Sequence, residues 1–154
     1  MSDIAAQMLT EALAAQKFTR KFFVVELDFS EASLHELERQ FEAVKYALRG
    51  GLSSENIVKL TGLWGAYVGE VLRRHCSAEW TAVESLTDES AEVSGAAASD
   101  AETMANSGAL PVLQGTSHVA RPHHQVRLRL EQGADQSIIR YYTETKAALG
   151  SRIS

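Results

Sequence analysis

The stretch LWGAYVGEVLRRHCSAEW, residues 63–80, decides the fold. It continues a segment, from about 54 to 75, in which large apolar residues recur every three or four positions, as on the buried face of a helix. At 100° per residue these side chains fall on a single stripe. The stripe contains Ile57, Leu60, Trp64, Val68 and Val71. The segment therefore predicts a long helix with one face in the core.

Three glycines, Gly62, Gly65 and Gly69, lie on one shoulder of this helix. A glycine inside a helix costs about 1 kcal/mol relative to alanine, so three of them on one side need a physical reason. The simplest is close approach of a neighbouring element, for which glycine leaves room. We expect this helix to be the central element of the molecule, contacted on two sides.

The chain before this helix predicts a helix, a strand and a second helix. Ala and Gln separate apolar residues at helical spacing over 3–17. The stretch KFFVVELDF, 21–29, is mainly aromatic and β-branched and alternates in its second half, which predicts a strand. Ser33 and Glu36 match a capping box, in which each side chain satisfies a free backbone donor of the other.

The helix that begins there is expected to end at Gly50–Gly51, because glycine accepts the left-handed conformation of a helix C-terminus. Ser53 or Ser54 is the expected N-cap of the next helix. A link this short predicts an antiparallel hairpin. Residues 50–54 lack the lysine and the length of a phosphate-binding P-loop, so we interpret them as a pair of caps.

The chain after residue 75 predicts a small sheet. The segment 79–86 has the composition of a strand, and 110–113 and 117–120 predict two shorter strands. Residues 87–109 are rich in Ala, Ser, Asp and Glu and poor in large apolar groups, so we expect a long, flexible acidic surface loop.

The last part begins at Pro122. Residues 123–131 are compatible with a helix or a strand, and the alternation of apolar and charged residues favours the strand. Gly133 is expected to end this element, and a final helix is expected from Asp135 or Ser137 to about Leu149. The chain thus predicts one α+β domain over 1–154: a helical hairpin packed with a small, mostly antiparallel sheet, followed by a C-terminal helix.

Composition narrows the class of protein. The net charge of −5 argues against nucleic-acid binding, for which a basic face is usual. A single cysteine, Cys76, allows no internal disulfide, which favours a reducing compartment and an inert, partly buried thiol. The start lacks the basic and apolar regions of a secretory signal, and no stretch is long and apolar enough to span a membrane. We expect a cytoplasmic protein.

Charge is distributed unevenly along the chain. From His75 to Ala120 there are seven acidic residues and no Lys or Arg, whereas the chain from Arg121 onward is net basic. One interpretation is an acidic surface that binds a basic protein, and the other is a solvated loop that keeps the protein in solution. The candidate partner-binding residues are Glu84, Asp88, Glu89, Glu92, Asp100 and Glu102.

Two further groups are candidate sites. Tyr67, Glu70 and Trp80 define a possible pocket beside the glycine shoulder, in which Glu70 would accept hydrogen bonds from a ligand. The alternative is an ion pair of Glu70 with Arg73 or Arg74, one helical turn away.

His118, His123 and His124 are close enough in sequence to bind a metal, but no cysteine or acid lies among them, so a polar surface turn is the simpler interpretation. We expect no metal site, no cofactor and no catalytic residue.

The motifs LDFSEASLHELE, GLWGAYVGEVLRRH and RPHHQVRLRLEQG, with Trp80 after the second, resemble a family of small uncharacterised bacterial proteins. That family has a strand ending in Leu-Asp before a helix, a Gly-Ala-Tyr-x-Gly-Glu helix, a Trp opening a short sheet, and a helix-Gly-helix tail. The resemblance covers most of the chain outside 87–109 and implies that 123–131 is helical. Some members are encoded near secreted toxins, which implies an immunity role for part of that family.

Three hypotheses about function follow. The first is a non-enzymatic cytoplasmic binding protein, in particular an immunity protein that occludes a basic toxin protein without binding nucleic acid or membrane. The second is a small ligand-binding domain or enzyme with its pocket near Glu70. The third is a structural protein that forms a homodimer through an exposed apolar stripe.

Overall fold

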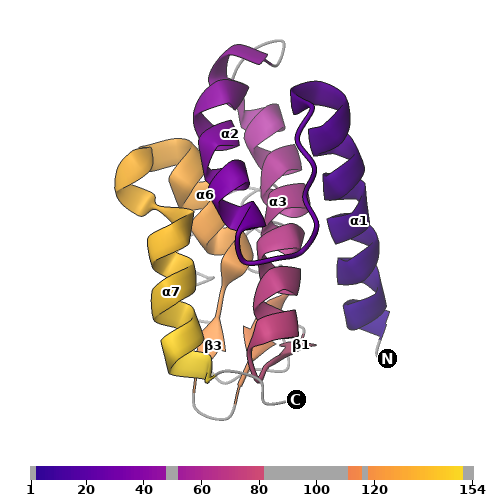
Figure 1. The fold of residues 1–154 in the computed structure, drawn as a ribbon, viewed down its shortest axis with the longest axis vertical. Helices are drawn as coiled ribbons and strands as arrows, with labels where there is room; N and C mark the ends of the chain where they lie inside the picture. The colour runs from indigo at the N-terminus through magenta and orange to yellow at the C-terminus, as the bar shows by residue number, and fades with distance from the viewer. Residues whose placement is uncertain (1–2, 48–51, 82–110, 116–117, 151–154) are drawn as a thin grey trace.

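The computed structural model describes residues 3–47, 52–81, 111–115 and 118–150 (Figure 1). Its elements in chain order are α1 (Asp3–Phe23), α2 (Ser33–Ala47), α3 (Ser54–His75), β1 (Glu79–Thr81), β2 (Val112–Gln114), β3 (Val119–Ala120), α6 (Pro122–Gln132), a 3₁₀ turn (Ala134–Gln136) and α7 (Ile138–Leu149). The expected α+β class, with a small antiparallel sheet and a C-terminal helix, is confirmed.

Helix α3 runs through the middle of the molecule, with α1 along one side and α6 along the other (Figure 1). The predicted stripe is its buried face: Leu60, Trp64, Val68 and Val71 are inaccessible to solvent, and Ile57 at its start is partly buried. The indole of Trp64 is the centre of an aromatic cluster with Phe18, Phe23 and Phe41. The expectation of a central helix contacted on two sides is therefore confirmed.

Helices α2 and α3 run in opposite directions and are joined through residues 48–53 (Figure 1). The ring centroids of Phe41 on α2 and Trp64 on α3 lie 4.9 Å apart. Ser53 is the N-cap of α3, because its hydroxyl accepts the backbone N–H of Asn56. The predicted cap at Gly50–Gly51 lies outside the described residues.

The predicted capping box at Ser33 is wrong. The hydroxyl of Ser30, three residues earlier, accepts the backbone N–H of Ser33. Ser33 itself already belongs to α2, and its own hydroxyl contacts Tyr67 on α3 instead of a backbone donor. Glu36 forms an exposed ion pair with Arg39. The start of α2 is thus held by the preceding turn and by α3.

The predicted strand at 21–29 is also wrong. Helix α1 continues to Phe23, and residues 24–32 cross to α2 without joining the sheet, whose described strands are β1, β2 and β3. Of the aromatic residues that suggested a strand, Phe23 packs against Phe18 and Trp64, and Phe29 stacks on Tyr67. The amide of Gln16 on α1 donates to the carbonyl of Leu27 at 2.5 Å, so a side chain takes the place of a neighbouring strand.

The three short strands form an antiparallel sheet in the order β1-β2-β3. Thr81 pairs with Val112, and Leu113 pairs with Ala120. The predictions of strands near 79–86, 110–113 and 117–120 are therefore confirmed within the described residues.

The segment 123–131 is helical, as the resemblance implied, and the strand favoured by alternation is wrong. The alternation misled because the charged Arg129 is buried, whereas Leu128 is only half-buried. The buried positions of α6 recur at helical spacing: Pro122, His123, Val126, Arg129 and Leu130. Gly133 ends α6 with a φ of 94°, and Ser137 caps α7 by accepting the N–H of Arg140, as expected.

Two of the three glycines on α3 are sites of close approach. A Cβ at Gly65 would lie 2.4 Å from Cδ2 of His123, and a Cβ at Gly69 would lie 2.1 Å from Cη2 of Trp80. Both distances are far below van der Waals contact. A Cβ at Gly62 would come no closer than 3.8 Å, to Oε1 of Glu11. The glycine shoulder is therefore required at two positions, where α6 and β1 lie on the bare backbone of α3.

We predict that Gly65→Ala and Gly69→Ala each lower the free energy of unfolding by about 1–3 kcal/mol, because an added methyl group must displace a buried ring. Gly62→Ala is the matched control. It should raise stability by up to about 1 kcal/mol, because alanine is the better helix former and has room. Urea denaturation of the three variants measures this, and equal effects at all three positions would contradict the close approach.

Candidate functional site

The carboxylate of Glu70 is buried and fully paired. Its Oε2 accepts the indole N–H of Trp80 at 2.8 Å and Nε of Arg73 at 2.9 Å, while its Oε1 accepts Nη2 of Arg73 at 3.1 Å. Nε of Arg74 lies 3.7 Å from Oε1. Burial acts to raise the pKa of Glu70, but the hydrogen bonds from Arg73 and Trp80 together outweigh it and keep the pKa below its usual value. Glu70 is therefore a charged structural anchor.

Tyr67 fastens the connection between α1 and α2. Its hydroxyl accepts the backbone N–H of Phe29 at 2.8 Å and lies 2.6 Å from the hydroxyl of Ser33. The rings of Tyr67 and Phe29 stack with their centroids 4.8 Å apart, and the guanidinium carbon of Arg74 lies over the Phe29 ring, 3.9 Å from its centroid. The polar atoms of Tyr67 and Glu70 thus form hydrogen bonds to neighbouring segments. The side chains of Tyr67, Glu70 and Trp80 hold those segments to the core.

The three histidines do not form a cluster. His118 and His124 are exposed, whereas His123 is buried between Gly65 and Trp80, its ring centroid 5.9 Å from that of the indole. In the described part of the chain no group of three His, Cys, Asp or Glu side chains is placed to hold a metal ion. His123 is best understood as a packing residue.

The imidazole of His123 is held neutral. Burial lowers its pKa to about 4, and the carbonyls of Gly62 and Pro111, which face the ring, only partly oppose this shift. Neither ring nitrogen reaches a described partner at ordinary hydrogen-bond geometry. A buried imidazole without full pairing makes the junction of α3, α6 and the sheet sensitive to acid.

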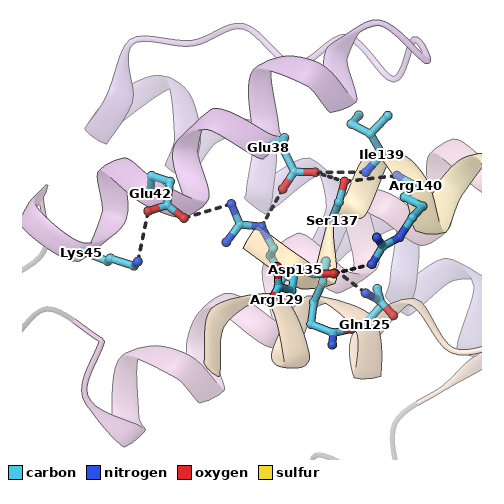
Figure 2. A network of polar contacts seen from close by, with 10 residues as sticks. Glu38, Glu42, Lys45, Gln125, Arg129, Asp135, Ser137, Ile139 and Arg140 are labelled. Atoms are coloured by element: carbon cyan, nitrogen blue, oxygen red, sulfur yellow. Dashed lines mark hydrogen bonds and ion pairs between the residues drawn. The ribbon is translucent and has the colours of Figure 1, made fainter. Parts of the chain in front are cut away.

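A second polar network, which the sequence analysis missed, joins α2, α6 and α7 (Figure 2). Arg129 is 3% exposed and donates from Nε to Oε2 of Glu38 at 2.6 Å, while its Nη2 lies 3.1 Å from Oε2 of Glu42. The other oxygen of Glu38 accepts the hydroxyl of Ser137 at 2.9 Å and the N–H of Ile139 at 3.1 Å. One carboxylate on α2 thus holds both α6 and the start of α7.

The candidate partner-binding residues lie outside the described residues. They are Glu84, Asp88, Glu89, Glu92, Asp100 and Glu102, all within 82–110. The structure describes the two points between which that segment runs: Thr81 ends β1, and its paired residue on β2 is Val112.

No protein-family model, curated protein or solved structure matches this chain. Among the described helices, none combines the length and the apolar composition needed to cross a membrane. Cys76 is buried at the end of α3, in agreement with an inert thiol.

We predict that Arg129→Met lowers the free energy of unfolding by about 2–4 kcal/mol, because it leaves Glu38 partly buried without its charged partner. Arg127→Met on the same helix is the control. Its ion pair with Glu131 is an exposed i,i+4 contact, for which a loss of about 0.3–0.5 kcal/mol is usual. Chemical denaturation of both variants would contradict this account if their losses were equal.

We predict that stability falls as the pH is lowered from about 6.5 to about 4. His123 takes up a proton near pH 6.5 in the unfolded state and near pH 4 in the folded state. The stability that the neutral, buried imidazole contributes is therefore intact above pH 6.5 and lost below pH 4. At about 1.4 kcal/mol per pKa unit the loss approaches about 3 kcal/mol.

The measurement is the free energy of unfolding against pH for the wild type and His123→Leu. Between pH 6.5 and pH 4, the slope of the free energy of unfolding against pH should be smaller in His123→Leu, because about one proton fewer is taken up on unfolding. His118→Leu, at an exposed position, should keep the wild-type slope. Parallel curves for wild type and His123→Leu would show that His123 does not titrate as the burial requires.

Proposed function

We propose that this protein is a non-enzymatic binding protein for a basic protein partner, and that it acts in the cytoplasm as an immunity protein that occludes a bacterial toxin. The observation that carries the proposal is the charge of residues 75–120, where seven carboxylates occur without one Lys or Arg. Such a one-sided charge attracts a basic partner and raises the rate of association.

The sheet supports this proposal because it holds together the two residues that flank the acidic segment. Thr81 and Val112, the residues on either side of 82–111, are paired in the sheet. Trp80, next to Thr81, is 4% exposed and hydrogen-bonded to Glu70 on the central helix. A partner that binds the acidic residues would therefore bind a segment whose two ends are adjacent and fixed to the core.

The surroundings of Glu70 favour binding over catalysis. A general acid or base needs an accessible proton and a pKa near the working pH. Glu70 has neither, because two arginines and an indole occupy its oxygens and hold its pKa low. The immunity role in particular rests on the family resemblance of the motifs around Trp80 and in the tail, and inhibition would be by occlusion.

We predict that a chain lacking residues 87–109 loses the partner and keeps its melting temperature within a few degrees. The deletion lies within the segment that connects Thr81 to Val112, and these two residues are paired in the sheet, so a shortened connection can still join them; loop-closure entropy changes slowly with length. The partner is first identified by co-purification of the tagged full chain from its native host. Affinity is then measured with the purified partner at several salt concentrations.

Two variants with the same net charge distinguish binding at a specific acidic surface from attraction by the net negative charge of the whole protein. One replaces Glu84, Asp88, Glu89 and Glu92 by their amides, and the other does the same at the exposed residues Asp3, Glu55, Asp135 and Glu144. We expect loss of affinity and of its salt dependence in the first and little change in the second. Unchanged binding by the deletion variant would show that the acidic residues do not form the partner-binding surface.

A further inference from the structure

An open cleft lies between the start of α2 and helix α7, and Glu70 is not among the residues that line it. Its volume is about 380 Å³, within the range of roughly 300–1,000 Å³ usual for small-molecule sites. Ala32 and Ile139 supply accessible apolar surface, and Leu34 beside the cleft is fully buried. Glu31 and His35 from one side and Tyr142, Thr143 and Lys146 from the other supply the polar groups.

Glu31 and Lys146 form an opposite charge pair in this cleft with unused capacity. Oε2 of Glu31 accepts both the hydroxyl of Tyr142 and Nζ of Lys146, the latter at 2.5 Å. From the residues that the structure describes, Oε1 of Glu31 accepts no hydrogen bond, and Nζ of Lys146 donates only to Glu31. The two side chains are 39% and 32% exposed, so an incoming molecule can reach the spare acceptor and the spare donors.

Both groups stay charged over a wide pH range. The hydrogen bond from Lys146, followed by that from Tyr142, holds the pKa of Glu31 below its usual value. The hydrogen bond to Glu31 holds the pKa of Lys146 above its usual value. The cleft therefore presents one anion and one cation side by side at neutral pH.

The wall that carries Glu31 is preorganised. Phe29, two residues before it, has a φ of 64°, which is unusual for a residue with a side chain. Its N–H donates to the hydroxyl of Tyr67, its carbonyl lies 3.3 Å from Nε2 of His75, and its ring contacts both the ring of Tyr67 and the guanidinium of Arg74. Strained backbone held by so many contacts is typical of ligand sites, where it fixes a side chain in advance.

These features select the chemistry of a ligand. A simple anion would be repelled by Glu31, a simple cation by Lys146, and an apolar molecule would cover both charges without pairing them. A molecule with an ammonium and a carboxylate on one carbon matches both spare groups, and an aliphatic side chain matches Ala32 and Ile139. We propose that this cleft binds a free aliphatic α-amino acid, its ammonium at Oε1 of Glu31 and its carboxylate at Nζ of Lys146.

This site goes beyond the proposed binding of a basic protein and does not depend on it. Thr143 and His35 border the same cleft and can add polar contacts to the carboxylate. Because the cleft is open to solvent, the expected affinity is in the millimolar range.

The test is a chemical-shift titration of the ¹⁵N-labelled full chain with L-leucine, N-acetyl-L-leucine and isoamylamine. L-leucine should give saturable shifts at residues 31–35 and 139–146. Removal of the ammonium charge or of the carboxylate should weaken binding about tenfold each, the usual effect of losing one charged hydrogen bond. No saturable shift with L-leucine up to tens of millimolar, or equal binding of all three, would overturn the proposal.

Three variants locate the site. Glu31→Gln should weaken L-leucine binding about tenfold, and Glu144→Gln, an exposed acid on α7, should leave it unchanged. Thr143→Trp fills the cleft from an exposed helical position and keeps the ion pair, so it should abolish binding in a chain that melts normally. Binding that survives Thr143→Trp would place the amino acid elsewhere and reject this cleft.

Discussion

The contact of Trp80 with helix α3 is the constraint on which the rest of the structure depends. The indole lies on the bare backbone of Gly69, and its N–H donates to Glu70, the next residue of the helix. Glycine is required for the ring to come this close, and the carboxylate is required because an indole N–H buried without an acceptor would be costly. Arg73 and Arg74 on the following turn compensate the buried charge. Four residues of one helix thus fix the sheet to the core.

Two further connections in the described part of the chain are held in the same manner, each by a polar side chain of a helix. Tyr67 holds the crossing from α1 to α2 through the backbone of Phe29. Glu38 holds the turn from α6 to α7 through Ser137 and the N–H of Ile139 (Figure 2). Because each polar group has a partner, burial of these groups orders the chain without leaving an unpaired charge. The polar and charged side chains that stand out in the sequence therefore mainly stabilise the fold.

Much of the fold could be predicted from the sequence, because apolar periodicity and caps are local signals. The helix over 54–75, its cap at Ser53, the short strands and the last helix all follow from such signals. The errors occurred where tertiary contacts override them. Phe22 and Phe23 suit a strand, yet α1 continues through them because Phe23 packs on Trp64. In α6 the burial of Arg129 depends on two glutamates of α2, and nothing near Arg129 in sequence indicates them.

In the candidate sites, too, contacts within one helix could be predicted from the sequence and contacts between different elements could not. The pairing of Glu70 with Arg73 and Arg74 was foreseeable from i+3 and i+4 spacing, but its bond to Trp80 was not, because it depends on how β1 folds back. The pair of Glu31 and Lys146 is separated by most of the chain and comes together only when α7 packs near the start of α2. Spacing predicts partners along one helix, and it gives no information about partners from different elements.

The adjacency of Thr81 and Val112 has a consequence for evolution. A segment inserted between two paired residues of a hairpin can lengthen, shorten or change its composition while the register below it stays the same. Closing a loop of twice the length costs only about 0.6 kcal/mol more. Selection can therefore change the length and composition of the segment between Thr81 and Val112 at little cost to folding, and related chains that share the scaffold are free to differ most there.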